Sequence, residues 1–259
     1  MNVLHGAGWV YDVVDDWTTH PSYQRLRRTL ENAYQTIDAR ADVIFTVSEQ
    51  LRKRFPRHRR VVWIPNAVDQ EHFRITGSEP DDLKGIARPF AMYAGVIEDR
   101  IDMPTIEHLV VHMPELPIVF VGPVWPLRFR WLRARAPIRR LASQYRSIVL
   151  LGQKSYNDLP RYLSRAAVGL IPHRVNAFTR TMDPLKLYEY LASGIPVVAT
   201  DVPGPERFPI GVDVAQTLES FTDAVRKRLH RAIDAATLRE QVRRETWSAR
   251  VEQMLSALA

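Results

Sequence analysis

The sequence predicts an α/β fold in which a doubly wound parallel sheet is covered by helices on both faces. Short runs rich in Val and Ile recur along the 259 residues, and a helical pattern separates most of them. This alternation is typical of buried parallel strands joined by helices. We expect nine strands, near residues 10–14, 42–47, 61–64, 90–95, 117–122, 147–151, 167–171, 195–199 and 210–214. Helices are expected at 22–39, 48–54, 102–112, 158–165, 184–193, 218–233 and 236–257, the last broken near Thr246 and Trp247.

A polar, turn-prone segment at 77–82 divides this pattern. The part that follows it carries five or six strands, enough for a complete doubly wound sheet. The part before it carries two or three, too few for an independent core of that kind. We therefore expect a partial domain over 1–80, a main domain over 81–240, and a C-terminal helix at 241–259 that packs back on the N-terminal part.

The composition indicates the cellular compartment. There is no cysteine, which excludes disulfides and thiolate metal sites and favours a reducing compartment such as the bacterial cytoplasm. No stretch approaches the roughly 18 apolar residues of a membrane-spanning helix, and the first residues lack the layout of a signal peptide. We expect a soluble, cytoplasmic protein.

The formal net charge is +7, and much of the excess lies in two basic blocks. A basic surface attracts nucleic acid, anionic lipid headgroups or a phosphate-bearing substrate. No zinc-finger spacing, Arg-Gly repeat or aromatic-rich strand supports nucleic acid, and any single arginine can simply be a solvated helix residue. An anionic membrane surface, which would place the protein on the inner face of the membrane, stays open. The blocks are Arg52, Lys53, Arg54, Arg57, Arg59 and Arg60, then Arg128, Arg130, Arg133, Arg135, Arg139 and Arg140.

The most informative stretch runs from 167 to 203. A buried strand at 167–171 is followed by a polar loop, and Asp183 and Pro184 then fit the N-cap and first residue of a helix that Gly194 ends. In an open parallel sheet, a loop at the carboxyl end of a strand lines the ligand crevice. The helix therefore directs its free N–H groups and positive dipole end toward that crevice, which suits a phosphate.

Two charged residues on this helix fit a sugar nucleotide. Lys186 lies in the first turn, where it adds a positive charge beside an anion, and Glu189 lies three residues later on the same face. A carboxylate can accept hydrogen bonds from both ribose hydroxyls. The alternative is an ordinary surface ion pair between neighbouring turns, and only the position after a strand and a long polar loop favours binding.

The run PLKLYEYLASGIPVVATDVPG at 184–204 resembles the C-terminal signature of GT-B-type glycosyltransferases, of the retaining group 1 class that builds bacterial surface polysaccharides. The resemblance covers nearly the whole chain in the family's order. It implies a Rossmann-like, nucleotide-sugar-binding C-terminal domain with a partial second Rossmann-like domain. The other matching segments are YDVVDDW (11–17), ADVIFTVSEQL (41–51), WIPNAVDQEHF (63–73), MYAGVI (92–97), IVFVGP (118–123), VLLGQKSYNDLPRYLSRAAVGLIPH (149–173) and ETWSARVEQML (245–255).

The resemblance also implies roles for individual residues. Glu189 would hold the ribose, Lys186 would contact the diphosphate, and Arg100 would help to neutralise the leaving group. Gln153 and Lys154 follow the strand that binds the base, which they would contact through their backbone. The rest of the donor site would comprise Pro184 and Leu185 at the helix start and Gly95 in the glycine loop. Asn176 and Thr179 are candidates because they lie in the polar loop ahead of the helix, where they could touch the sugar or the phosphates or simply shape the loop, and His173 is a weaker candidate.

The family needs no bound metal, so we expect no cofactor beyond the nucleoside diphosphate sugar, which is the donor substrate. Asp15 and Asp16 are adjacent carboxylates, but neighbouring side chains at a strand end point to opposite faces and cannot form one tight site. The acceptor would be a lipid-linked molecule or a glycan.

Two departures from the family bear on activity. Thr181 stands where the family usually has a glutamate for the donor sugar. The chain is also short, because only the last strand and helices of the acceptor-binding domain match. A partner chain could supply that half, the acceptor could bind in an unusual way, or the chain could be a truncated, inactive remnant.

These alternatives leave two main functions: a glycosyltransferase of the hexosyltransferase type, or an inactive nucleotide-sugar-binding or scaffolding subunit. A sugar-nucleotide epimerase is a third, but it would need acid and base carboxylates in both domains, and none can be identified.

Overall fold

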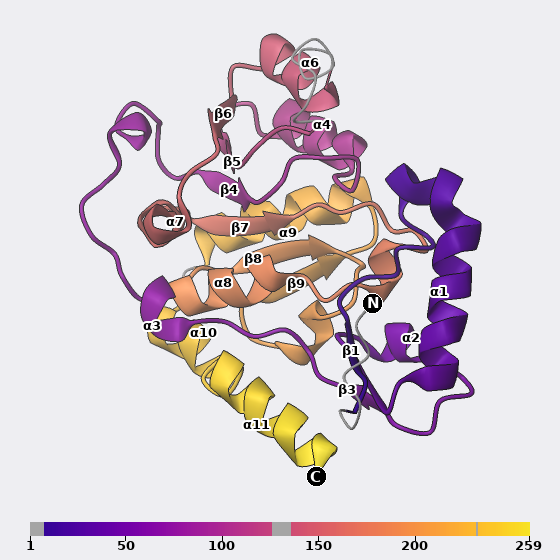
Figure 1. Cartoon of the computed structure of the whole chain (residues 1–259). Helices are drawn as coiled ribbons and strands as arrows, with labels where there is room; N and C mark the ends of the chain where they lie inside the picture. The colour runs from indigo at the N-terminus through magenta and orange to yellow at the C-terminus, as the bar shows by residue number, and fades with distance from the viewer. Residues whose placement is uncertain (1–7, 126–135, 232) are drawn as a thin grey trace.

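The computed structural model describes residues 8–125, 136–231 and 233–259, which form two parallel sheets (Figure 1). Each of the nine predicted strands is present. The smaller sheet has the order β1-β2-β3, and the larger has the order β6-β5-β4-β7-β8-β9. Their bounds are β1 Val10–Val13, β2 Val43–Thr46, β3 Val61–Trp63, β4 Ala91–Ala94, β5 Ile118–Val121, β6 Ile148–Gly152, β7 Val168–Ile171, β8 Val197–Thr200 and β9 Val212–Ala215.

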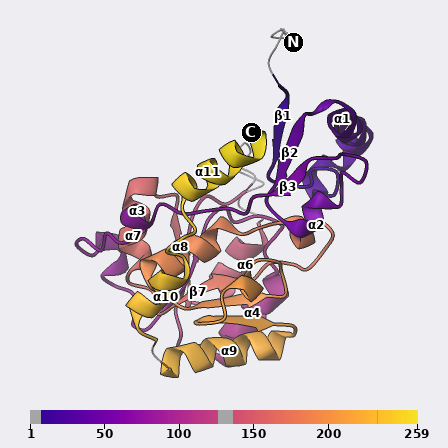
Figure 2. The ribbon, with the colours of Figure 1, turned by 90° about the horizontal axis from the view of Figure 1, so that it is seen from below.

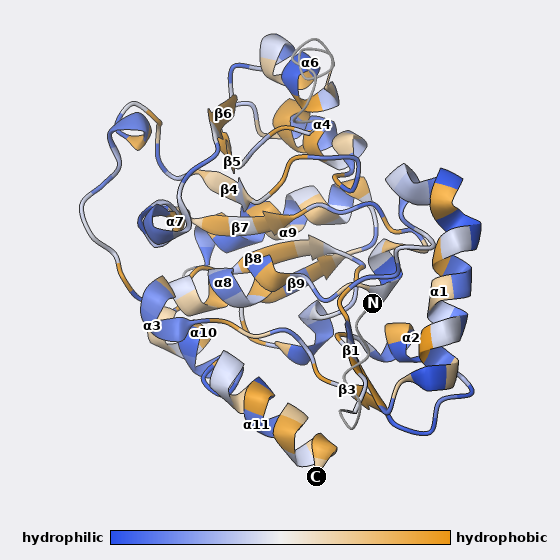
Figure 3. Cartoon of the chain, in the orientation of Figure 1, coloured by the Kyte–Doolittle hydropathy of each residue, from blue (hydrophilic) through white to orange (hydrophobic). Residues whose placement is uncertain are grey.

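The larger sheet is doubly wound, as the sequence predicts. Its chain order reverses between β4 and β7, because the strands after β4 extend to one edge and those after β7 to the other. One apolar cluster joins one face to α3, α7, α8 and α10, and a second joins the opposite face to α4, α6 and α9. The central strands are mostly apolar, while the helices around them have one apolar side (Figure 3). The bounds are α3 Gln70–Phe73, α4 Met103–His112, α6 Pro137–Gln144, α7 Leu159–Leu163, α8 Leu185–Ser193, α9 Leu218–His230 and α10 Ala235–Gln241.

The smaller sheet is covered by α1 (Arg27–Arg40) and α2 (Glu49–Arg52) on one face and by the C-terminal helix α11 (Trp247–Leu258) on the other (Figure 2). Met254 and Ala257 of α11 pack near Val43, Phe45 and Ile64 of this sheet. The last helix is broken where predicted, since α10 ends before Thr246 and the Thr246 hydroxyl caps α11.

Two helices differ from the sequence prediction. Helices α3 and α6 were not expected. Most of the second basic block, from Arg128 to Arg135, lies outside the described residues; Arg139 and Arg140 are exposed on α6.

The start of α8 also differs. Asp183 is not the N-cap: Pro184 holds that position, α8 begins at Leu185, and no side chain caps it. The Asp183 carboxylate instead accepts hydrogen bonds from the backbone N–H of Asn66 at 2.7 Å and from the hydroxyl of Tyr188 at 2.5 Å. Gly194 ends the helix in a left-handed conformation, as predicted.

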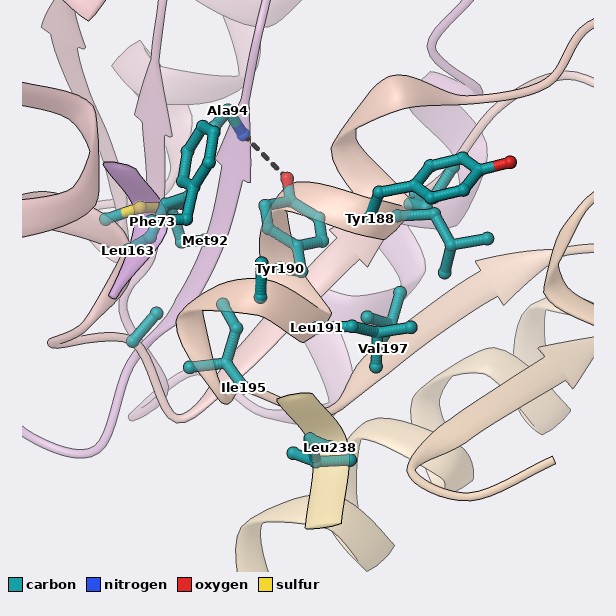
Figure 4. Packing of buried hydrophobic residues seen from close by; sticks show 14 of the residues in the cluster. Phe73, Met92, Ala94, Leu163, Tyr188, Tyr190, Leu191, Ile195, Val197 and Leu238 are labelled. Atoms are coloured by element: carbon teal, nitrogen blue, oxygen red, sulfur yellow. Dashed lines mark hydrogen bonds between the residues drawn. The ribbon is translucent and has the colours of Figure 1, made fainter. Parts of the chain in front are cut away.

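Tyr190 fastens α8 to the sheet at the point where the strand order reverses. Strands β4 and β7 pair only through Ala91 with Val168 and Met92 with Gly169, and then part. The buried Tyr190 hydroxyl enters the gap and accepts a hydrogen bond from the Ala94 N–H at 2.9 Å (Figure 4). It also donates to the Leu170 carbonyl at 3.4 Å. It thereby satisfies backbone groups that the parted strands leave without each other.

Replacing Tyr190 with Phe should lower the free energy of unfolding by roughly 1–3 kcal/mol, because the buried Ala94 N–H loses its partner. Chemical denaturation measures the change. Tyr11→Phe is the matched control, since Tyr11 is exposed on β1 and should be neutral. Equal stability of the two variants would contradict the role given to this hydroxyl.

Candidate functional site

The candidate site lies at the carboxyl ends of β4, β5 and β6, where Gly95 and Gly122 follow the first two strands and Gly152 ends the third. Gly95, Gly122 and Gly152 have positive φ angles of 133°, 145° and 72°. At Gly122 a side chain is excluded, because a Cβ atom there would lie 1.9 Å from the carbonyl oxygen of Gly95. The loops after β4 and β5 therefore touch, and they form one edge of the candidate site beside the reversal point, where ligands bind in doubly wound sheets.

Lys186 reaches this edge from the first turn of α8. A Cβ atom at Gly95 would lie 3.4 Å from Lys186 Cε, and Lys186 Nζ lies 5.1 Å from the centre of the Tyr93 ring. The ammonium forms no hydrogen bond or ion pair with any described residue. Burial, followed by the positive charge of Arg100, lowers the pKa of Lys186 to about 8, although Glu189 and Glu98 act in the opposite direction. A partly desolvated cation without a counter-ion, at the carboxyl ends of parallel strands, is a candidate for a functional role.

Glu189 follows one turn later and is partly buried. No described side chain pairs with its carboxylate. Burial raises the pKa of Glu189, and the charges of Lys186 and His72 oppose that shift. The structure thus brings Lys186 and Glu189 close enough to influence each other, and it leaves both without a fixed partner among the described residues.

Arg100 lies on the loop after β4 and forms an ion pair with Glu98. Its guanidinium lies 5.7 Å from the centre of the Phe178 ring, and its charge affects Lys186. A shallow cleft beside it is lined by His20, from the N-terminal part, and by Asn176. Arg100 is therefore near the predicted site, but Glu98 already neutralises part of its charge.

Asn176 and Thr179 stabilise their own loop. The Asn176 side-chain oxygen accepts hydrogen bonds from the N–H groups of Phe178 and Thr179, both at 3.0 Å, and the Thr179 hydroxyl accepts from the Asn176 N–H at 3.0 Å. Thr179 is fully buried. The bonds that these two side chains make account for the loop geometry, and a contact with substrate stays a prediction.

The remaining predicted residues lie around this centre. Gln153 is exposed just after β6, while the Lys154 ammonium turns to Asp82 at 2.6 Å, which leaves the Lys154 backbone for any ligand contact. Pro184 is buried, and Leu185 is 45% exposed at the uncapped start of α8.

His173 is fully buried, and neither of its ring nitrogens has a hydrogen-bond partner among the described residues. Burial, together with the charges of Lys186 and Arg100, holds its pKa well below the ordinary value, so the ring is neutral.

Sequence reasoning missed two neighbours of the site. Tyr93 lies beneath Lys186, and Tyr156 lies near Glu189. Tyr93 sits inside an apolar strand and so had no distinguishing signal. Tyr156 could have been found as an aromatic residue in a polar loop after a strand.

Within 8–125, 136–231 and 233–259, no three His, Asp or Glu side chains gather closely enough to hold a metal ion. None of the described helices combines the length and apolar character needed to cross a bilayer.

The sequence is similar to those of known glycosyltransferases. Residues 103–231 match the family described as glycosyl transferases group 1. The chain is 25% identical over 214 residues to the putative teichuronic acid biosynthesis glycosyltransferase TuaH of Bacillus subtilis, a match that covers 76% of this chain and 51% of TuaH. The chain thus spans about half the length of this relative.

Solved structures show the same fold. Sucrose-phosphate synthase from Thermosynechococcus elongatus matches with a TM-score of 0.75 and 20% identity, over 98% of this chain and 68% of that one. HepE from Anabaena, in complex with UDP and glucose, matches with a TM-score of 0.70 and 16% identity, over 97% of this chain and 71% of that one. Residues 103–231 thus match a glycosyl transferases group 1 domain, and the chain has the GT-B fold of these solved structures.

Proposed function

We propose that this chain binds a nucleoside diphosphate sugar and transfers the sugar to an acceptor in surface polysaccharide or glycolipid biosynthesis. The observation that carries the proposal is the arrangement of Lys186 and Glu189 at the uncapped start of α8. The Lys186 side chain lies against Gly95, after β4, and has no anionic partner among the described residues. Glu189 lies one turn away on the same side of α8. HepE, a relative in fold, binds UDP and glucose, which supports this class of donor.

The chemistry follows from the charges. When the bond between sugar and diphosphate breaks, negative charge grows on the leaving phosphate oxygen. Lys186, the free N–H groups that begin α8, and the partly neutralised Arg100 would stabilise that charge more than the ground state, which lowers the barrier. Glu189 would accept hydrogen bonds from the ribose hydroxyls and fix the nucleotide. These groups supply the neutralisation themselves, so the proposal requires no metal and no cofactor besides the donor.

A second candidate is a nucleotide-sugar-binding or scaffolding subunit without transfer activity. We propose that residues 1–80, whose small sheet α11 covers on one face, form part of the acceptor domain. In the described chain β1 pairs on one side only, and Trp9 and Val10 are 45% and 44% exposed. A partner chain could complete this sheet.

Incubation with a panel of radiolabelled sugar nucleotides separates the two candidates. An active transferase should release or transfer label from at least one donor, and Glu189→Ala should abolish this. Binding of a donor without any release or transfer would favour the scaffolding function, and absence of binding to every donor would contradict both.

Lys186→Ala should weaken binding of the preferred sugar nucleotide by roughly 1.5–3 kcal/mol, the range for charge-assisted hydrogen bonds. The affinity for the sugar nucleotide should also depend on pH in one direction. Because the pKa of Lys186 is lowered to about 8, its ammonium is charged below that pH and loses its proton above it. The affinity of the wild-type protein should therefore fall as the pH rises above about 8, and calorimetry at pH 7 and pH 9.5 measures this.

Lys186→Arg provides the control, because a guanidinium stays charged over this range and should remove the fall. Lys84→Ala is the control for loss of a lysine, since Lys84 pairs with Asp81 on the surface. An affinity of Lys186→Ala equal to that of Lys84→Ala would rule out the diphosphate contact.

We also propose that the basic segment after β2 meets an anionic membrane surface, where lipid-linked acceptors lie. Arg52, Lys53, Arg57, Arg59 and Arg60 are all exposed. Anionic lipid attracts such a segment by about 1 kcal/mol for each basic residue near the surface. The protein should float with vesicles that contain anionic lipid, and less so at high salt. Equal flotation with neutral vesicles would exclude this electrostatic contact.

A further inference from the structure

A cleft of about 330 Å³ lies where the small sheet meets the large one. Residues 47–50 and Trp63 line it on the side of the small sheet, and residues between 180 and 183 and between 201 and 207 line it on the other side. Small-molecule sites are frequent where two such units meet. None of the residues assigned above to the nucleotide sugar lines this cleft, so a ligand bound here would be a different one.

Trp63 supplies an aromatic surface in the cleft. Its side chain is 37% exposed, and its indole N–H donates to the Val47 carbonyl at 3.0 Å, which fixes the ring. The only polar atom of the ring is therefore satisfied within the protein. The exposed part of the ring can offer an apolar contact, such as the C–H face of a sugar ring makes.

Arg207 is held beside this ring. Its guanidinium lies 5.8 Å from the centre of the Trp63 ring, and 5.3 Å and 5.2 Å from the centres of the Tyr188 and Phe208 rings. It also donates a hydrogen bond to the Tyr188 hydroxyl. Because a guanidinium has five N–H donors, Arg207 can donate to a ligand in the cleft as well.

Asp183 adds a buried oxygen that lacks a hydrogen bond. The residue is 7% exposed, and its Oδ1 atom has no hydrogen-bond partner among the described residues, although an Arg207 nitrogen lies 3.5 Å away. Gly204 leaves space beside this atom, because a Cβ atom at that position would lie 3.0 Å from Oδ1. A buried oxygen without a hydrogen bond costs free energy, which a ligand hydroxyl would recover.

The charges that line the cleft narrow the class of ligand. Four carboxylates outnumber two guanidiniums, so the cleft is acidic and disfavours phosphate and anionic lipid. Carboxylates accept hydrogen bonds from hydroxyl groups, and guanidiniums donate to hydroxyl oxygens. Together with the aromatic surface, this set fits a neutral saccharide. The charged residues are Glu49, Asp183, Asp201 and Glu206, with Arg180 and Arg207.

We propose that this cleft binds a neutral saccharide. The apolar face of one sugar ring packs on Trp63, and its hydroxyls bond to Arg207, to Asp183 and to the exposed carboxylates of Asp201 and Glu206. The inference goes beyond the proposed function, because it adds a carbohydrate site that shares no residue with the nucleotide-sugar site. It does not require transfer activity, so the two can fail separately.

Saturation-transfer NMR and NMR titration of the full chain with glucose, galactose, mannose and N-acetylglucosamine, without nucleotide, test this proposal. At least one sugar should bind, and Trp63→Ala should weaken it by about tenfold or more, as expected for loss of a central aromatic contact. Trp247→Ala is the matched control, because Trp247 is 46% exposed on α11 and lies outside the cleft.

The double variant Asp201→Ala/Glu206→Ala keeps the test valid if Trp63→Ala does not fold, because both side chains are exposed. It should also weaken the sugar, whereas Glu71→Ala, on the exposed side of α3, should not. Glucose 6-phosphate should bind no more tightly than glucose, because the cleft is acidic.

Failure of all four sugars to bind at millimolar concentration would overturn the proposal. Unchanged sugar affinity in the double variant, or in folded Trp63→Ala, would also overturn it, since the sugar would then bind elsewhere. Tighter binding of glucose 6-phosphate than of glucose would contradict the neutral class of ligand. Titration of the wild type with UDP in parallel tests the proposed function alone, so loss of either result leaves the other standing.

Discussion

Helix α8 carries the charged residues of the site, and its position depends on a very close approach to the sheet. A Cβ atom at Gly169 would lie 2.4 Å from Cδ2 of Tyr190, so only glycine in β7 leaves room for that ring. The ring brings its hydroxyl to the gap between β4 and β7, where it bonds to both strands. Strands β4 and β7 separate where the Tyr190 hydroxyl binds, and Lys186 extends toward the end of β4 beside this place. The close packing of Tyr190 on Gly169 and the position of Lys186 therefore both depend on the separation of β4 and β7.

A second constraint is electrostatic. The Lys186 ammonium is partly withdrawn from water and has no anionic partner among the described residues, which costs free energy and lowers its pKa. Arg100 increases that cost, although Glu98 compensates part of the Arg100 charge. A bound diphosphate would remove the penalty by supplying the missing negative charge. In contrast, Lys154 and Asp82 satisfy each other on the surface, and such a pair needs no ligand.

The two sheets are connected through a buried polar network near the start of α8. The Asn66 backbone and side-chain amides donate to Asp183, and the Arg250 guanidinium of α11 donates to the Pro65 carbonyl at 2.8 Å. Burial raises the pKa of Asp183 to about 6 in spite of the nearby Arg207. This network fixes the segment after β3 against α8. It also explains why the first turn of α8 is free to face a ligand, since Asp183 is already engaged elsewhere.

The sequence by itself determined the strands, the doubly wound sheet and the placement of Lys186 and Glu189 on one helix face. These features depend on local periodicity, on glycine and proline positions and on the 3.6-residue repeat, all of which are visible along the chain. It could not predict that Asp183 would leave the helix cap for Asn66, that Glu98 would pair with Arg100, or that His72 would stack on Tyr156. These contacts join residues separated by 117 positions in the first case and 84 in the last, and only the tertiary fold brings such groups together. For the pair at 98 and 100, which are near in sequence, the turn after β4 decides whether the side chains meet. Local patterns therefore specify elements, whereas partner choice among polar groups depends on which neighbours the packed structure supplies.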